Sequence, residues 1–215
     1  LSTMGFRGEA LASIASVSNV SLVTASKTQK SSTQITLSAG HVASEGQSNR
    51  SEGTLISVEN LFFNTPARLK FLKKASSELH YIQDVVKTLI LANPSVSVTL
   101  SNEEGVLLSN EGGSLEDAIY SVYGAKNADR LLPIIENQRG NIRVTGYTSA
   151  VDFTKPNRTY QSIIVNGRAV QDATIQTAVE RAYADFLMKR TYPMFIVDVL
   201  MPFEDVDVNV HPSKT

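Results

Sequence analysis

The sequence predicts an α+β fold in two parts, and three observations support this prediction. Stretches with the two-residue alternation of strands and stretches with the 3.6-residue repeat of helices occur in both halves of the chain. A polar, glycine-rich stretch at residues 110–114 is the best candidate for a linker. With 42% hydrophobic and 19% charged residues, the composition is typical of a globular protein. We therefore expect two domains, residues 1–109 and 110–215, each of ordinary size.

In the first half, residues 9–15 predict a short helix after a pair of glycines. Three strand signals follow, at residues 17–27, 33–37 and 53–58, from β-branched content or from polar and apolar alternation. The polar, serine-rich stretch between Gly40 and Gly53 predicts a surface loop.

A short helix that carries Arg68, Lys70, Lys73 and Lys74 is expected next, followed by a long helix. Thr65 suits the N-cap and Pro66 the first helical position, where its missing N–H costs nothing. An apolar face over residues 79–90 predicts the long helix, and alternation over 96–108 around a polar turn predicts a hairpin.

The second half opens with a predicted capping box, in which Ser114 and Asp117 start a helix over 115–123 that ends at Gly124. Asn166-Gly167 is a strong signal for a type I′ hairpin. Strands are expected at residues 131–135, 142–148, 160–165, 194–200 and 205–210. Asp172 is expected to cap a helix whose apolar face runs from Ile175 to Leu187.

Charge and composition exclude several classes of protein. The net charge is −1, so nucleic-acid binding would need a local basic patch. The chain has no cysteine, which excludes disulfides, thiolate metal sites and a cysteine nucleophile. Its three histidines, His41, His80 and His211, are not spaced as metal ligands. No apolar run approaches the ~20 residues of a membrane span, and no signal peptide is visible.

The glycine pair Gly5 and Gly8 brackets Phe6 and Arg7 immediately before the first predicted helix. Glycine allows the backbone to approach a ligand closely, and the free N–H groups at a helix start attract anions. A side chain at either glycine would obstruct such an approach. The motif therefore indicates phosphate binding, with an ordinary turn as the alternative.

The densest basic cluster consists of Arg68, Lys70, Lys73 and Lys74. Such a cluster is commonly a solvated face. The alternative is contact with the phosphate backbone of DNA. Both interpretations stay open at this point.

Four motifs follow one another along the chain: GFRGEAL at residues 5–11, GT at 53–54 leading to LFFNTPAR at 61–68, VNGR at 165–168 and VDVNVHPSK at 206–214. In order and spacing they resemble the N-terminal region of the MutL family of DNA mismatch repair proteins. This family is part of the GHKL ATPase superfamily. The resemblance covers nearly the whole chain and implies that the first part of such a region is missing here.

The resemblance implies the C-terminal part of a Bergerat (GHKL) ATP-binding α/β sandwich, followed by a domain similar to ribosomal protein S5 domain 2. It also implies that ATP is bound by the backbone amides around Gly5, Phe6, Arg7 and Gly8. Thr54 resembles a threonine that bonds near the adenine, and Lys214 resembles a lysine that reaches the γ-phosphate from the second domain. A compact ammonium group suits a terminal phosphate.

Arg168, just past the Asn-Gly turn, is a candidate for DNA contact, and Arg68, Lys70 and Lys73 of the basic cluster are the other candidates. MutL relatives often carry further arginines after the VNGR motif, whereas this chain has Ala169-Val170-Gln171-Asp172. Residues proposed to substitute for those arginines are Lys155, Arg158 and Arg181.

Hydrolysis in this family uses a glutamate that activates water and an asparagine that holds Mg²⁺, in a segment that precedes GFRGEAL. No residue of this chain takes either role, so we expect residues 1–215 alone not to turn over ATP, and the intact protein to do so slowly. The resemblance further implies dimerisation with itself or with a MutL-type paralogue. Mismatch-recognition and downstream repair proteins, and DNA, are the other expected partners, in the bacterial cytoplasm or a eukaryotic nucleus.

Two functions without nucleotide chemistry are alternatives. A KH-type RNA-binding module also uses a Gly-x-x-Gly loop, but places it between two helices. A non-enzymatic scaffold needs neither RNA nor ATP. Nucleotide titration distinguishes these functions, because only a mismatch-repair ATPase binds ATP.

Overall fold

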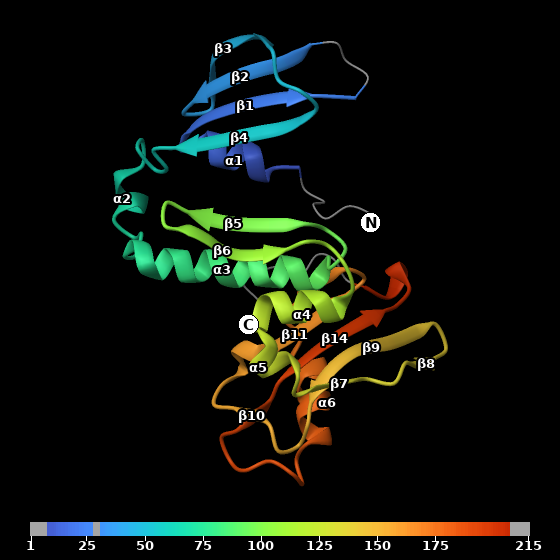
Figure 1. Cartoon of the computed structure of the whole chain (residues 1–215). Helices are drawn as coiled ribbons and strands as arrows, with labels where there is room; N and C mark the ends of the chain where they lie inside the picture. Colours follow the sequence, from blue (N-terminus) through green and yellow to red (C-terminus); the bar gives the residue numbers. More distant parts are fainter. Residues whose placement is uncertain (1–7, 28–30, 207–215) are drawn as a thin grey trace. The chain divides into compact units, whose positions relative to one another are not determined.

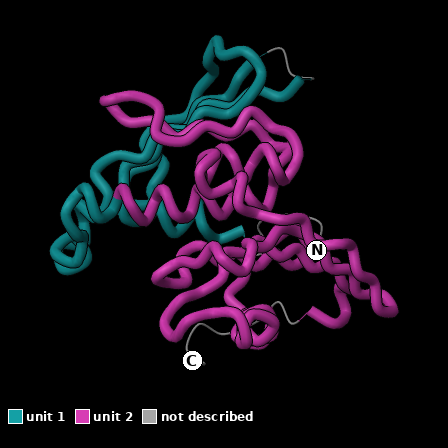
Figure 2. The backbone as a smooth tube through the Cα atoms, turned by 60° about the horizontal axis from the view of Figure 1, so that its bottom comes forward, with its two compact units in different colours: residues 1–78 teal, residues 79–215 magenta. Residues whose placement is uncertain are grey.

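The computed structural model describes residues 8–27 and 31–206, and these divide into two compact units (Figures 1 and 2). The first unit is Leu1–Glu78 and the second is Leu79–Thr215. Their boundary lies within the long helix α3 (Ala75–Ala92). The predicted domain boundary between residues 109 and 110 lies inside the second unit, and a division into domains at that point stays a prediction.

The first unit contains a short helix and a four-stranded antiparallel sheet. Helix α1 spans Ala10–Ala15. The strands are β1 (Asn19–Ala25), β2 (Ser32–Ser38), β3 (His41–Ser48) and β4 (Gly53–Glu59), in the order β3-β2-β1-β4. The helix and the three strands expected from sequence are confirmed.

Strand β3 corrects the expectation of a surface loop between Gly40 and Gly53. Ala39 and Gly40 have φ of 49° and 82° and turn the chain tightly from β2 into β3. Almost every residue of β3 is exposed, and Val42 is its only large apolar residue. An edge strand of this kind has no buried face, so it shows no apolar alternation for a sequence pattern to detect.

The short basic helix α2 is smaller than expected, because it spans only Pro66–Leu69. Pro66 occupies its start, as predicted, but Thr65 makes no capping hydrogen bond with its side chain. The Thr65 hydroxyl oxygen is instead buried with no partner in the described part of the chain. Lys70, Lys73 and Lys74 lie beyond the helix rather than on it.

In the second unit, α3 leads into the predicted hairpin of β5 (Val98–Asn102) and β6 (Gly105–Asn110). Asn110 is 1% exposed, and its amide donates to the carbonyl oxygens of Pro94 (3.0 Å) and Val96 (2.8 Å). The stretch expected to be a linker therefore begins with a buried residue, Asn110, that joins the end of β6 to the segment after α3.

Helix α4 (Leu115–Tyr123) begins with the predicted capping box, since the Ser114 hydroxyl accepts from the Asp117 N–H and the Asp117 carboxylate accepts from the Ser114 N–H. Gly124, at φ 72°, ends it as expected. The short helix α5 (Ala125–Ala128) follows directly. Within the described residues, no helix is long and apolar enough to cross a membrane.

The main sheet of the second unit has the strand order β12-β11-β14-β9-β7, and β8 also pairs with β9. Strands β11 and β14 pair in parallel and the other neighbours are antiparallel. Bounds are Leu131–Pro133 for β7, Asn137–Arg139 for β8, Ile142–Ser149 for β9, Gln161–Val165 for β11, Arg168–Val170 for β12 and Phe195–Leu200 for β14. A small second sheet joins β10 (Thr154–Lys155) to β13 (Tyr192–Pro193). Two 3₁₀ turns, η1 (Arg158–Tyr160) and η2 (Phe203–Asp205), flank β11 and β14.

Alternate residues of β14 supply two apolar cores, one on each face of this sheet. On one face, Ile196 and Met194, the residue directly before β14, pack with Ile90 and Leu91 of α3 and Ile119 of α4. On the other face, the buried cluster contains Phe195, Val197 and Val199, with Ile175 and Val179 of α6 packed against it. Because β14 is buried on both sides, it reads as the continuous apolar run that the sequence shows.

Helix α6 spans Ala173–Ala182 and is capped by Asp172, whose carboxylate accepts from the Ile175 N–H at 2.7 Å. The expected extension to Leu187 is wrong, because the helix ends after Ala182. Tyr183 turns inward and is 8% exposed, whereas Phe186 is 64% exposed. The apolar repeat continues past the helix, but its residues face different surroundings. The predicted strand at 205–210 falls mainly outside the described residues.

Replacing Thr65 tests whether its hydroxyl caps α2. We expect Thr65→Val to leave the unfolding midpoint unchanged or to raise stability by up to about 1 kcal/mol, because valine removes a buried oxygen without a partner. A capping threonine would instead lose about 1 kcal/mol on the same change. Urea unfolding of the wild-type and variant proteins measures the difference.

Candidate nucleotide site and nucleic-acid interface

Of the predicted phosphate-binding residues, Gly8 is described, while Gly5, Phe6 and Arg7 lie outside the described residues. Gly8 is exposed and has φ of +66°, in the left-handed region that glycine adopts without strain. A Cβ added at Gly8 would meet no atom within 4 Å. Among the described residues, the requirement for glycine at this position is therefore its positive φ rather than a lack of space.

The loop after β4 is hydrogen-bonded to the C-terminal end of α1, the helix that follows Gly8. The Asn64 side-chain amide donates to the Ser16 carbonyl oxygen at 2.9 Å, and the Phe62 N–H donates to the Val17 carbonyl oxygen at 2.6 Å. The buried Ser18 hydroxyl donates to the Ile14 carbonyl oxygen at 2.6 Å. Together these bonds satisfy backbone carbonyls at the end of α1 and directly after it, and the Ile14 carbonyl also accepts from the Val17 N–H.

Phe62 in this loop has φ of +66°, a strained backbone for a bulky residue. Such strain persists only where surrounding contacts hold it, and here the bond from Phe62 to Val17 does so. Sequence reasoning gave Asn64 no role. The presence of an asparagine in a loop between two elements was the available signal for such a tie.

Thr54 lies in β4 directly opposite Thr24 of β1, and their hydroxyl oxygens are 2.8 Å apart. Both are on the sheet, so a role in sheet pairing accounts for this contact. Lys214 lies outside the described residues. Nucleotide contact by Thr54 and by Lys214 stays a prediction.

The basic residues expected to contact DNA fall into two groups. Arg68, Lys70 and Lys73 are exposed, at and just beyond the end of α2. Arg168 is half-buried as the first residue of β12, directly after the Asn166-Gly167 turn. That turn has the predicted form, with φ of 50° and 74° at its two residues.

Lys155 and Arg158 are engaged within the second unit. The Lys155 ammonium bonds the Asn127 side-chain oxygen and lies 4.4 Å from the Phe153 and Tyr160 ring centres. Burial lowers the pKa of Lys155, with a smaller contribution from Lys126. Arg158 makes two hydrogen bonds to the Glu180 carboxylate, at 2.7 and 2.9 Å. These contacts engage two of the three cations that were expected to replace the missing arginines, and the third, Arg181, is exposed.

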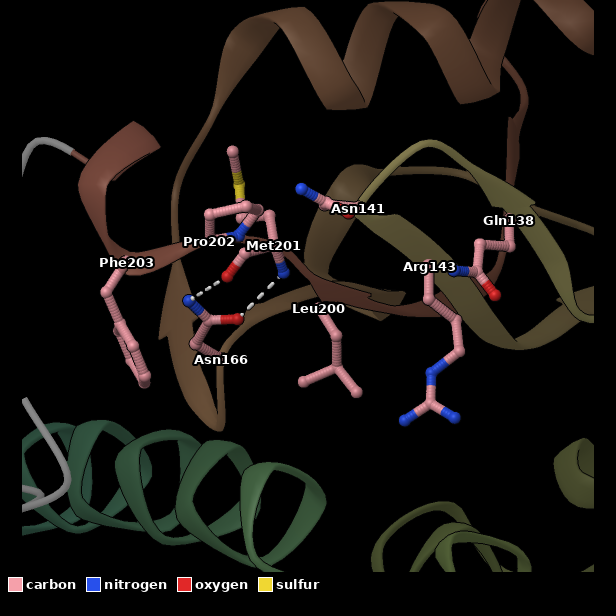
Figure 3. A pocket seen from close by; sticks show the side chains of 8 residues that line it. All are labelled: Gln138, Asn141, Arg143, Asn166, Leu200, Met201, Pro202 and Phe203. Atoms are coloured by element: carbon pink, nitrogen blue, oxygen red, sulfur yellow. Dashed lines mark hydrogen bonds between the residues drawn. The ribbon is translucent and has the colours of Figure 1, made fainter.

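A pocket of about 630 Å³ opens where β14 ends (Figure 3). Asn166 fixes its wall, because its side-chain amide donates to the Met201 carbonyl oxygen at 2.9 Å and its side-chain oxygen accepts from the Met201 N–H at 3.0 Å. Sequence reasoning found Asn166 only as a turn residue. The pocket is lined by Gln138, Asn141, Arg143, Asn166, Leu200, Met201, Pro202 and Phe203.

Asp198 in β14 is a carboxylate that sequence reasoning missed. One of its oxygens is buried without a hydrogen-bond partner among the described residues. Burial raises the pKa of Asp198, and the charge of Arg143 partly opposes that effect. No cluster of three or more histidine or acidic side chains in the described part of the chain could hold a metal ion. Ionised Asp198 therefore lowers the stability of the folded protein.

Solved structures with this fold are ATP-binding domains. The Aquifex aeolicus MutL ATPase domain complexed with ADP matches 91% of this chain and 72% of that chain, with a TM-score of 0.73 and 24% identity. A topoisomerase IV ATP-binding domain from Francisella tularensis matches 92% of this chain and 59% of that chain, with a TM-score of 0.50 and 12% identity. The chain thus has the predicted α+β fold, which it shares with these solved ATP-binding domains.

The comparisons in sequence are more specific. The family model for the DNA mismatch repair protein C-terminal domain matches residues 119–215. The MutL protein of Ligilactobacillus salivarius is 41% identical over 213 residues, which are 99% of this chain and 32% of the relative. The corresponding values for Geobacillus kaustophilus MutL are 41%, 99% and 34%. The chain belongs to the MutL family of DNA mismatch repair proteins, and it spans about a third of the length of these curated relatives.

Removing the Asn64 amide tests its role in holding α1. We expect Asn64→Ala to lower the free energy of unfolding by about 1 kcal/mol, since the Ser16 carbonyl loses its partner. Backbone amides of α1 should then exchange faster with solvent. Asn141→Ala is the matched control, because the Asn141 side chain is exposed and makes no hydrogen bond within the described residues. Equal effects of both variants would contradict the assignment.

The pH dependence of stability tests Asp198. Its pKa is higher in the folded than in the unfolded state, where it is near 3.8, so stability is greatest below that value and falls as pH rises through the folded pKa. Asp198→Asn should therefore stabilise the protein at neutral pH and have less effect near pH 3.

Asp152 is the control with the opposite sign. A hydrogen bond from Arg130, at 2.6 Å, lowers the pKa of Asp152, so its contribution is present at neutral pH and is lost as pH falls. Asp152→Asn should destabilise at neutral pH only. Thermal unfolding at a series of pH values measures both, and the same trend for both variants would be inconsistent with a desolvated Asp198.

Proposed function

We propose that the intact protein is a mismatch-repair ATPase that binds ATP, dimerises when nucleotide binds and passes the signal of mismatch recognition to downstream repair proteins. Membership of the MutL family supports the repair role. The observation that carries the nucleotide role is the GHKL fold, shared with a MutL ATPase domain that was solved with ADP. Gly8, with its left-handed backbone ahead of α1, fits a loop whose amides face a phosphate.

In this proposal the nucleotide is held from two parts of the chain. Backbone amides of residues 5–8 bind the phosphates, Thr54 bonds near the adenine, and the Lys214 ammonium contacts the γ-phosphate. Mg²⁺ is held by a residue outside this sequence. Lys214 loses its partner when the γ-phosphate leaves, so the nucleotide state biases the arrangement of the region that carries this lysine.

The proposal assigns no water-activating base to this chain. A general base must lie within hydrogen-bond reach of the water that it activates, and no motif of the sequence supplies one beside residues 5–8. Residues 1–215 are accordingly proposed to be inactive in hydrolysis alone, and the enzyme activity is a property of the intact protein.

DNA binding is proposed for the exposed cations. Arg68, Lys70 and Lys73 form an exposed local basic cluster. Because the net charge of the chain is −1, attraction to phosphates requires a local cluster of this kind. Arg168 is a further contact. Lys155 and Arg158 contribute less, since each already has an intramolecular partner.

Nucleotide-dependent dimerisation of the intact protein tests the proposal. With a non-hydrolysable ATP analogue we expect the wild type to dimerise, and Lys214→Ala to dimerise at least tenfold more weakly because one charge-assisted contact of 1.5–3 kcal/mol, on the order of a tenfold effect, is lost. Analytical ultracentrifugation measures the change. Lys126→Ala is the control, because Lys126 is exposed. Unchanged dimerisation of Lys214→Ala would refute the role of Lys214, and a wild type that binds no nucleotide would refute the proposed function.

A further inference from the structure

The loop between α6 and β13, residues 183–191, exposes two large apolar side chains next to two cations. Phe186 is 64% exposed and Met188 is 83% exposed. Lys189 and Arg190 follow directly in the sequence and are also exposed. We refer to residues 183–191 as the apolar–basic loop. This apolar and cationic composition is complementary to a ligand that is partly apolar and negatively charged.

Hydrogen bonds within the loop fix its backbone. The N–H groups of Phe186 and Leu187 both donate to the Tyr183 carbonyl oxygen, at 2.9 and 3.1 Å. The Thr191 N–H and hydroxyl both donate to the Met188 carbonyl oxygen, at 3.2 and 2.8 Å. Successive turns therefore hold the loop in one shape without using the side chains of Phe186 or Met188.

Tyr183 anchors the base of the loop. It is 8% exposed, and its hydroxyl donates to the Ser149 carbonyl oxygen at 2.6 Å and contacts the Thr148 hydroxyl. At the other end, Arg190 has φ of +66°, a conformation that costs a non-glycine residue of order 1 kcal/mol or more. A loop that is anchored and strained, yet presents apolar side chains to solvent, is organised in advance for a partner.

The charges beside the apolar pair favour a polyanion. Neither Lys189 nor Arg190 makes a hydrogen bond or an ion pair in the described part of the chain. Glu180, the nearest acid on α6, is neutralised by Arg158 at 2.7 Å. Asp185 is the single acid within the loop. The loop therefore has unpaired positive charge at the position of its exposed apolar side chains.

The geometry points to the apolar–basic loop as a binding site for duplex DNA, in which Phe186 and Met188 wedge between base pairs from the minor groove and Lys189 and Arg190 bind the flanking phosphates. Apolar side chains of this kind unstack a base step and bend the duplex, and the cations offset the cost through phosphate contact. The inference rests on the proposed DNA-directed function and adds a surface that is separate in sequence from Arg68, Lys70 and Lys73. It also gives a role to the residues that the end of α6 leaves outside the core.

Duplex binding and bending by the intact protein test this site. A 30-base-pair duplex carrying a donor and an acceptor dye at its ends reports binding by anisotropy and bending by energy transfer, at several salt concentrations. We expect the double variant Phe186→Ala, Met188→Ala to bind about tenfold more weakly and to lose the bend, with the same salt slope. The double variant Lys189→Gln, Arg190→Asn should lower the salt slope by about 2, since asparagine tolerates the positive φ.

Matched controls separate the site from a general loss of surface. Ile135→Ala removes an apolar side chain that is 90% exposed in the same unit, and it should leave affinity and bending unchanged. All of these side chains are exposed, so unfolding midpoints should stay within the wild-type error.

Four outcomes decide the inference. Wild-type binding with unchanged affinity and bending in both loop variants would overturn the inference while leaving the proposed function intact. Equal weakening by Ile135→Ala would also overturn it. Loss of binding to phosphatidylserine vesicles in the loop variants, with duplex binding unchanged, would assign the loop to a membrane surface instead. A wild type that binds no duplex would remove both the inference and the DNA part of the proposed function.

Discussion

The second unit depends on the pairing of β14 with β11 in parallel on one side and with β9 in antiparallel on the other. Parallel neighbours need a long connection, and β12 and α6 form this connection here. Both faces of β14 are covered. Of the five residues from Phe195 to Val199, all but Asp198 are buried, and each pairs with a residue of β11. A polar side chain in this strand therefore loses its hydration on folding, and Asp198 is the residue of β14 to which this applies.

Asparagine side chains tie together segments that the sheets leave unconnected. Asn64 holds the end of α1, Asn110 joins β6 to the segment after α3, and Asn166 binds the chain where it leaves β14. Each side-chain amide bonds to backbone groups, so it fixes the path of the main chain rather than the position of another side chain. Asn64 thereby fixes the end of α1, and Asn166 fixes the main chain at Met201, directly after β14.

Local rules predicted the elements in which one signal dominates. The Ser114–Asp117 capping box, the Asp172 cap and the Asn166-Gly167 turn depend on neighbouring residues alone, and all three form as expected. Strand β3 was missed because an edge strand exposed on both faces has no apolar period. Thr65 occupies the N-cap position as predicted, but its hydroxyl makes no capping bond at its φ and ψ of −132° and 71°. The burial of Tyr183 ended α6 early, and no local pattern encodes that contact.

The candidate site shows the same division between local and long-range information. Motifs identified Gly8, whose backbone conformation depends on the absence of a Cβ, but no pattern identified Asn64, whose partner is 48 residues away in the sequence. The sequence also did not show which cations have an intramolecular partner. Lys155 and Arg158 resemble Lys189 and Arg190 in composition, yet the first pair is held by Asn127 and Glu180. In a protein of net charge −1, attraction to a polyanion comes from cations that the fold leaves without partners. The distribution of intramolecular partners, rather than the number of basic residues, therefore decides which cations of this chain are available to a ligand.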